Sequence, residues 1–164
     1  MDRIWAPWRL KYIKSDKKKN GCILCNVLKE NHTLLYQDDL CFVVLNKYPY
    51  TNGHILICPN THKASLEELA PNEMNRIGLL LQKSTSILKE AMNSMGFNIG
   101  LNLGRAAGAG IEDHLHFHVV PRWMGDGNFM PVIGETKVLS ADLTEVHSSL
   151  LPKFEALKKI ICGQ

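Results

Sequence analysis

Residues 113–123 read Asp113-His114-Leu115-His116-Phe117-His118-Val119-Val120-Pro121-Arg122-Trp123, with histidines at alternate positions. Side chains of an extended strand alternate between its two faces, so the three histidines would share one face. Imidazoles titrate near neutral pH, and a face given to them is not filled by packing, which favours a chemical role. The spacing alone leaves three readings open: a site for nucleotide or phosphate chemistry, a metal site, and ordinary polar residues on a half-exposed sheet.

The composition is that of an ordinary globular domain. The chain has 164 residues, of which 45% are hydrophobic and 21% charged, so it can bury a core without disulfides. Its longest apolar runs are far too short to span a bilayer, and no basic-then-apolar signal opens it. We therefore expect a cytoplasmic protein with no membrane partner. We expect one domain over 1–164, with an arm and loop at 1–21, a core at 22–123 and a loop and helix at 124–164.

Positive charge gathers at the start of the chain, although the net charge is only +3. A basic end on a near-neutral body is weak evidence for polyanion binding, and Lys17-Lys18-Lys19 is better explained as a solvated tail. Nucleic acid is therefore not an expected partner. Trp5, Trp8 and Tyr12 alternate with basic residues, which predicts an arm that docks on its own domain or on a second subunit.

Five cysteines, an odd number without a secretion signal, argue against a disulfide framework. Cys22 and Cys25 have the spacing of a metal knuckle. A redox dithiol is the alternative, but no βαβ pattern surrounds it. Cys41, Cys58 and Cys162 lie in apolar contexts and are predicted to be small core residues.

Apolar periodicity predicts a mixture of strands and helices in one chain. Alternating or short apolar runs predict strands at 34–37, 41–45, 54–58 and 97–103 beside the histidine strand, the first three as an antiparallel meander. Helical spacing predicts helices at 22–29, 71–95 and 143–161, with the methionines of the long helix in the core, and a glycine and alanine loop at 104–110.

The histidine stretch matches a known pattern. The run His114-Leu115-His116-Phe117-His118-Val119-Val120 follows H-φ-H-φ-H-φ-φ, the signature of the histidine triad (HIT) superfamily. The segment Asn46-x7-Gly53-His54-Ile55-Leu56-Ile57-Cys58-Pro59 resembles its nucleoside-contacting block, N-x7-GH-φφφ-x-P. Residues 5–9, Trp-Ala-Pro-Trp-Arg, and 121–129 resemble the bacterial diadenosine tetraphosphate phosphorylase (ATP adenylyltransferase) branch of that superfamily.

This resemblance implies a HIT-like α+β fold, a mostly antiparallel sheet with a long helix and a C-terminal helix beside it, commonly as a homodimer. It also implies chemistry at an α-phosphate. His116 would attack the phosphorus and form a nucleotidyl-histidine intermediate, which divides one hard displacement into two easier ones. His118 would donate a hydrogen bond to a phosphate oxygen or to the leaving group. His54, on the neighbouring strand, would complete the same side of the site.

The resemblance assigns nucleotide contacts to five more residues. Asn46 would bind ribose hydroxyls, and Asn102 would reach the phosphates or the nucleophile. Without the resemblance, both asparagines could equally be turn or strand-end caps. Arg105 and backbone N–H groups of the glycine loop, including Gly108 and Gly110, would surround the phosphates.

The chain departs from the superfamily pattern at one place. Many relatives carry Gln-Ser or Gln-Thr just before the triad to assist the leaving group, where this chain has Gly110-Ile111. A smaller residue leaves room for inorganic phosphate as co-substrate, which favours phosphorolysis of diadenosine tetraphosphate to ATP and ADP. A hydrolase and a nucleoside phosphoramidase are alternatives in the same class. A nucleotide-binding module without turnover, and a catalytic metalloenzyme that uses all three histidines, are alternatives of other classes.

The resemblance also implies a structural zinc ion. In zinc-bearing relatives the two thiolates of the knuckle are joined by a histidine just after the G-H strand and by the first histidine of the triad. These four positions are Cys22, Cys25, His62 and His114 here, and two thiolates balance the charge of the ion. No organic cofactor is expected.

Overall fold

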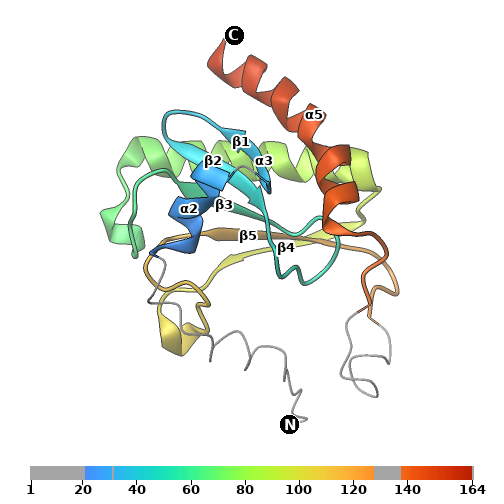
Figure 1. The fold of residues 1–164 in the computed structure, drawn as a ribbon, viewed down its shortest axis with the longest axis horizontal. Helices are drawn as coiled ribbons and strands as arrows, with labels where there is room; N and C mark the ends of the chain where they lie inside the picture. Colours follow the sequence, from blue (N-terminus) through green and yellow to red (C-terminus); the bar gives the residue numbers. More distant parts are fainter. Residues whose placement is uncertain (1–20, 31, 128–137, 164) are drawn as a thin grey trace.

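The computed structural model describes residues 21–30, 32–127 and 138–163. The predicted aromatic arm therefore lies outside the described residues. In the described part, five strands form one sheet of order β1-β2-β3-β5-β4, in which every pair of neighbours is antiparallel (Figure 1). The elements are α2 (Ile23–Glu30), β1 (Leu34–Gln37), β2 (Cys41–Leu45), β3 (Ile55–Pro59), η2 (Leu66–Glu68), α3 (Pro71–Met92), β4 (Gly96–Leu101), η3 (Arg105–Ala107), β5 (Phe117–Arg122) and α5 (Leu143–Cys162).

The predicted α+β fold is confirmed, and the predicted meander of β1, β2 and β3 is present. The histidine strand is shorter than expected, because β5 begins only at Phe117. Before Phe117 the backbone hydrogen-bonds to a different segment, because the Leu115 N–H donates to the Lys63 carbonyl at 2.6 Å. His118 therefore lies within the strand, whereas His114 and His116 precede it.

Helix α3 begins and ends at recognisable signals. Pro71 occupies its first turn, and the Glu73 carboxylate accepts a hydrogen bond from the Ala70 N–H at 2.7 Å. The helix ends before Asn93, which takes a left-handed conformation with φ 52°, so it is shorter than predicted. The prediction that its methionines fill the core is wrong for Met74, which faces outward and is 43% exposed, and for Met95, which lies beyond the end of the helix and is 68% exposed.

Helix α5 packs through four side chains at helical spacing, Val146, Leu150, Phe154 and Leu157, all of which are buried. The Asp142 side chain caps its first turn by accepting from the Glu145 N–H at 2.8 Å. Its last turn is exposed, so the prediction of a core position for Cys162 is wrong, whereas Cys41 and Cys58 are buried as predicted. None of the described helices is long and apolar enough to cross a membrane.

The two faces of the sheet are covered unequally. One face packs on α3 and α5 in a continuous core that includes Val43, Ile57 and Val119. The opposite face is covered over β2 and β3 by α2, through a smaller cluster around Leu24 and Phe42. Beyond this cluster the same face continues over β5 and β4, where the described part of the chain leaves a cavity. Alternation along β5 places His118, Val120 and Arg122 on that open face.

Candidate functional site

Four side chains from three separate parts of the chain converge beside α2. Cys22 and Cys25 lie at the start of that helix, His62 follows β3, and His114 precedes β5. Their ligand atoms all lie within 4.8 Å of one another. The Nδ1 atom of His114 is 3.4 Å from both cysteine sulfurs, and Nδ1 of His62 is 3.4 Å from the Cys25 sulfur.

These distances suit a tetrahedral zinc ion. Zinc–sulfur and zinc–nitrogen bond lengths place a sulfur and a nitrogen ligand about 3.6 Å apart on a tetrahedron. The Nε2–H of His114 donates to the Pro59 carbonyl at 2.9 Å, so its Nδ1 carries the lone pair that faces the thiols. Burial also lowers the pKa of His114, which keeps the ring neutral at neutral pH. The cluster can therefore hold a metal ion that would fasten α2 to the segments before β5 and after β3.

The buried carboxylate of Glu73 holds the segment that carries His62. Thr61 Oγ1 donates to Glu73 at 2.6 Å and Lys63 Nζ at 2.5 Å, so both neighbours of His62 are tied to α3. Burial opposes the charge on Glu73, but the hydrogen bonds from Lys63 and Thr61 outweigh it and lower the pKa of Glu73 from 4.5 to about 2.

Replacing Glu73 with glutamine is expected to lower the free energy of unfolding at neutral pH by about 2 kcal/mol, because Lys63 loses its charged partner. The pKa of Glu73 is lower in the folded state, so its contribution is present above about pH 4.5 and fades toward pH 2. Urea unfolding at neutral pH and at about pH 3 measures this, and the difference between wild type and variant should shrink at the lower pH.

Glu90→Gln is the matched control for Glu73→Gln. Glu90 lies on the same helix and pairs with Lys153 at 2.5 Å, but its side chain is 74% exposed. A surface pair contributes little, so this variant should change stability by no more than about 0.5 kcal/mol. Equal effects of the two substitutions would contradict the role given to Glu73.

His116 is buried, and one hydrogen bond determines which of its nitrogens can react. Its Nδ1 lies 2.8 Å from the His114 carbonyl, which can only accept, so the proton is on Nδ1. The lone pair is then on Nε2. The His116 and His118 rings meet edge to face with centroids 5.0 Å apart. In the described residues the metal-type cluster includes His114 but neither of these two histidines.

A chain of hydrogen bonds likewise determines the protonation of His118. The Tyr50 backbone N–H donates to Nδ1 of His54 at 3.0 Å, so the proton of the neutral His54 ring is on Nε2. That Nε2 donates to Nδ1 of His118 at 2.9 Å. The proton of the neutral His118 ring is therefore on Nε2. The Tyr50 ring also stacks on the fully buried His54, with centroids 4.9 Å apart.

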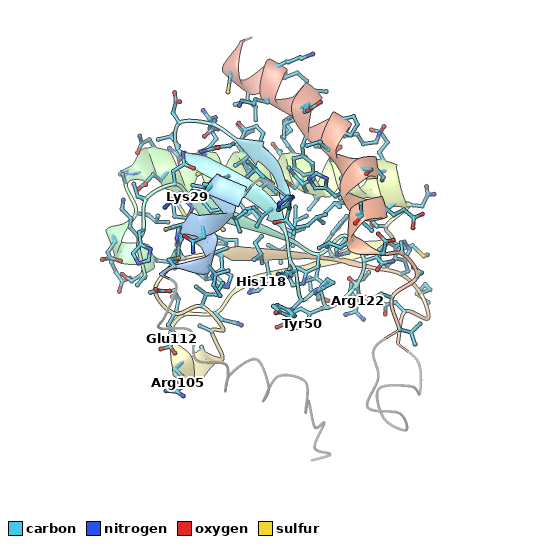
Figure 2. The ribbon with its side chains drawn as sticks, viewed as in Figure 1. Lys29, Tyr50, Arg105, Glu112, His118 and Arg122 are labelled. Carbon is cyan, nitrogen blue, oxygen red and sulfur yellow. The ribbon has the colours of Figure 1, made fainter. Side chains whose placement is uncertain are left out.

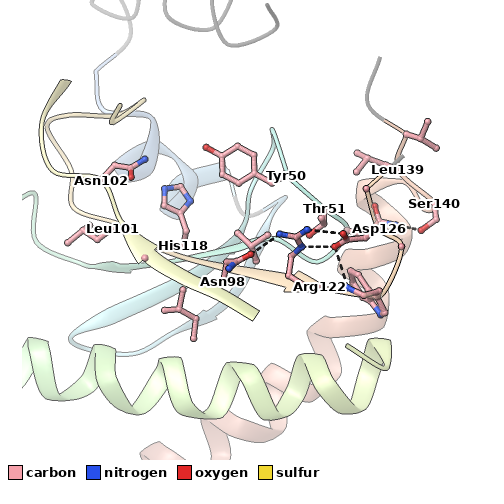
Figure 3. Close-up of a pocket in the computed structure, with 18 of the residues that line it drawn as sticks. Tyr50, Thr51, Asn98, Leu101, Asn102, His118, Arg122, Asp126, Leu139 and Ser140 are labelled. Atoms are coloured by element: carbon pink, nitrogen blue, oxygen red, sulfur yellow. Dashed lines mark hydrogen bonds and ion pairs between the residues drawn. The ribbon is translucent and has the colours of Figure 1, made fainter. Parts of the chain in front are cut away.

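His118 borders a cavity of about 890 Å³ on the open face of the sheet (Figure 3). Tyr50, His118 and Asn102 lie toward one end of it, and Arg122 and Asp126 lie toward the other. Its wall also includes Asn98, Gly100, Val120, Trp123, Leu139 and Ser140. This volume is within the range of cavities that bind small organic ligands.

The remaining residues predicted to contact the nucleotide are not among those that line the cavity. Asn46 lies beside His54, with its Nδ2 3.2 Å from Nδ1 of His54 and its Oδ1 accepting from a backbone N–H. The Gly108 N–H donates to the Arg105 carbonyl at 2.9 Å, within the loop itself. Arg105, Gly108 and Gly110 are not among the residues that line the cavity. Figure 2 shows Arg105 on η3, away from Tyr50 and Arg122. Their contacts with a nucleotide stay predictions.

Sequence reasoning missed three residues that shape the site. Tyr50 and Glu73 carry no motif, because their roles depend on stacking and on contacts across the fold. Arg122 had a usable signal. Side chains alternate between the faces of β5, so Arg122, four residues after His118, lies on the same face.

Comparisons with known proteins show the family of the chain. Residues 28–124 match the HIT domain family. The AP-4-A phosphorylase of Mycobacterium tuberculosis is 35% identical over 161 residues, which cover 92% of this chain and 83% of the relative. Adenylylsulfatase HINT3 of Arabidopsis thaliana is 34% identical over 112 residues, covering 67% of this chain and 56% of that protein.

The fold has solved counterparts as well. The crystal structure of a zinc-bound histidine triad family protein from Mycobacterium smegmatis has a TM-score of 0.69 and 26% sequence identity, and the match covers 85% of this chain and 97% of the other. The sequence match over the triad, the near full-length relative and the shared fold lead to one conclusion: this chain belongs to the HIT family.

Proposed function

We propose that this protein transfers nucleotidyl groups through a covalent bond to His116, and that it cleaves diadenosine tetraphosphate with inorganic phosphate to give ATP and ADP. The observation that carries the proposal is the pair of assigned ring protons. His116 offers a lone pair on Nε2, and the neighbouring His118 carries a proton on its own Nε2. A nucleophile beside a hydrogen-bond donor that stabilises the leaving group suits a displacement at phosphorus. The relative named AP-4-A phosphorylase supports the choice of substrate.

The first step forms the intermediate. The Nε2 lone pair of His116 attacks an α-phosphorus of the dinucleotide, and the bond from that phosphorus to the bridging oxygen breaks. The His118 Nε2–H donates a hydrogen bond to the departing oxygen and stabilises its negative charge, while His54 keeps the ring of His118 oriented through its own Nε2–H. ATP leaves, and AMP stays bound to His116 through a nitrogen–phosphorus bond.

The second step returns the enzyme to its starting state. Inorganic phosphate attacks the same phosphorus, the nitrogen–phosphorus bond breaks, and its electron pair returns to Nε2 of His116. The phosphate attacks through an anionic oxygen, so the ring of His118 neither gains nor loses a proton, and its Nε2–H again donates a hydrogen bond to the reacting phosphate. ADP leaves. Gly110 stands where many relatives have glutamine, and we take the smaller residue to favour phosphate over water as the acceptor because it would leave room for phosphate.

The products formed with and without phosphate test this proposal. With diadenosine tetraphosphate and inorganic phosphate we expect equal amounts of ATP and ADP, separated by anion-exchange chromatography. ³²P-labelled phosphate should appear in ADP and not in ATP, because phosphate is the second acceptor. Products that do not change when phosphate is added contradict phosphorolysis, and release of AMP then indicates a hydrolase. Binding without any product would indicate a nucleotide-binding module.

Homodimer formation and a cytoplasmic location stay predictions for this chain. Zinc is proposed as a structural ion on the four ligands Cys22, Cys25, His62 and His114. When bound it would cross-link three segments of the chain, and the reaction steps above use only side chains outside that cluster.

A further inference from the structure

On the open face beside β5, strand β4 has glycine at two of three positions, with Asn98 between them. In the antiparallel pairing, Gly100 of β4 lies opposite His118 and Gly96 lies opposite Arg122. A Cβ atom built on either glycine would meet nothing within 4 Å, so space lies above both. The open face thus forms a groove that runs along the strands from His118 to Arg122, about 13 Å at the usual rise per strand residue.

Arg122 is held rigidly at the far end of this groove. Its Nε and Nη2 donate to the two carboxylate oxygens of Asp126 at 2.6 and 2.8 Å, and its Nη1 donates to Asn98 Oδ1 at 2.8 Å. A guanidinium has five N–H groups, so one on each terminal nitrogen remains after these three bonds to described residues. The side chain is 47% exposed and lines the cavity. An arginine already fixed in place loses little entropy when it binds an anion.

The direction of the groove matches the direction of the proposed displacement. In-line attack sends the leaving group away from the nucleophile along the line through phosphorus. His116 lies directly before β5, and His118 and Arg122 lie on one face of that strand, so a leaving group that passes His118 along the groove continues toward Arg122. The cavity of about 890 Å³ is large enough for a nucleotide and not only for a phosphate group.

We infer that this groove binds the leaving half of the substrate, a nucleoside triphosphate, with its phosphates over Gly100 and an anionic oxygen on Arg122. The inference rests on the proposed function, because it takes His116 as the nucleophile. It explains the absence of a side chain at Gly100, since a side chain there would project into the groove beside His118. It also gives a role to Arg122, which the covalent chemistry does not require.

Binding measured without turnover tests the inference. In a His116→Asn background, where the dinucleotide is not consumed, calorimetry compares the Kd of diadenosine tetraphosphate with that of AMP. We expect the dinucleotide to bind tighter by roughly tenfold or more, because it gains the groove contacts. Adding Gly100→Val should remove this difference and leave the Kd of AMP unchanged, since valine suits a strand and projects into the groove. Arg122→Gln should weaken the dinucleotide alone by roughly tenfold.

Two matched substitutions serve as controls. Gly78→Val adds the same side chain at an exposed helical glycine with open space above it, and Lys89→Gln removes one positive charge from the same helix. Neither should change either Kd. If AMP binds but the dinucleotide gains nothing in the parent protein, the inference is wrong while the proposed function stands. If neither ligand binds, both are wrong. If Gly100→Val changes only the association state in sedimentation experiments, the groove is an interface between copies of the chain and the inference is wrong.

Discussion

His116→Asn is expected to lower kcat for nucleotidyl transfer by about four orders of magnitude or more, because the covalent path is lost with the nucleophile. Asparagine can still place an N–H near the His114 carbonyl, where His116 Nδ1 now donates at 2.8 Å. It has no nitrogen lone pair that could attack phosphorus. The fold should therefore survive while the chemistry does not, and the melting temperature should stay within a few degrees of wild type.

Trapping the intermediate measures the same step directly. Dinucleotide labelled with ³²P at the α-position, quenched under alkaline denaturing conditions without inorganic phosphate, should label wild type at His116 and leave His116→Asn unlabelled. The label should be released by acid, as a nitrogen–phosphorus bond requires. His32→Asn is the control, because His32 is exposed and lies outside the site. Full activity of His116→Asn, or label found on another residue, would remove the covalent mechanism.

Loss of the metal is expected to destabilise the fold before it affects the chemistry. Zinc at about a thousand times its Kd stabilises the folded state by about 4 kcal/mol. For a chain of this size that corresponds to a fall in melting temperature of about 8–16 °C when the metal is lost. Cys25→Ser should produce this fall, because the Cys25 sulfur lies 3.4 Å from both His62 and His114.

Metal content, melting temperature and activity should be followed together during chelation. Activity at low temperature should decline only as the protein unfolds, since His116 and His118 lie outside the ligand cluster. Cys162→Ser is the control, because its thiol is exposed on the last turn of α5. Immediate loss of turnover on chelation, with the fold intact by circular dichroism, would instead indicate that the metal takes part in the reaction.

The elements of the fold were predictable where the signal is local. The short apolar runs of β1 and β2 and the helical spacing of Val146, Leu150 and Phe154 depend on neighbouring residues only, and these elements lie where the sequence places them. The start of β5 was not predictable in this way. The Leu115 N–H binds the Lys63 carbonyl, and a partner 52 positions away leaves no trace in the local pattern.

The candidate site likewise has features that the local sequence predicts and features that it does not. The triad and the Cys-x-x-Cys pair could be read from spacing, because the spacing is the motif. The anchoring of His62 by Glu73, the stacking of Tyr50 on His54 and the fixing of Arg122 by Asp126 could not, because no motif records them. Each of these contacts depends on how the folded chain places one side chain against another.

The amino-acid sequence by itself determined which reactive groups the protein has, the order in which they follow, and the family to which it belongs. Only the tertiary structure decided how the three histidines divide their work. His114 faces thiols that lie about 90 positions earlier, while His118 meets His54 from a position 64 residues away. The physical reason is that a ring nitrogen can act as a metal ligand, a nucleophile or a hydrogen-bond donor according to the hydrogen bond on the opposite nitrogen. In this protein the partners of those bonds are brought into place by the packing of the sheet.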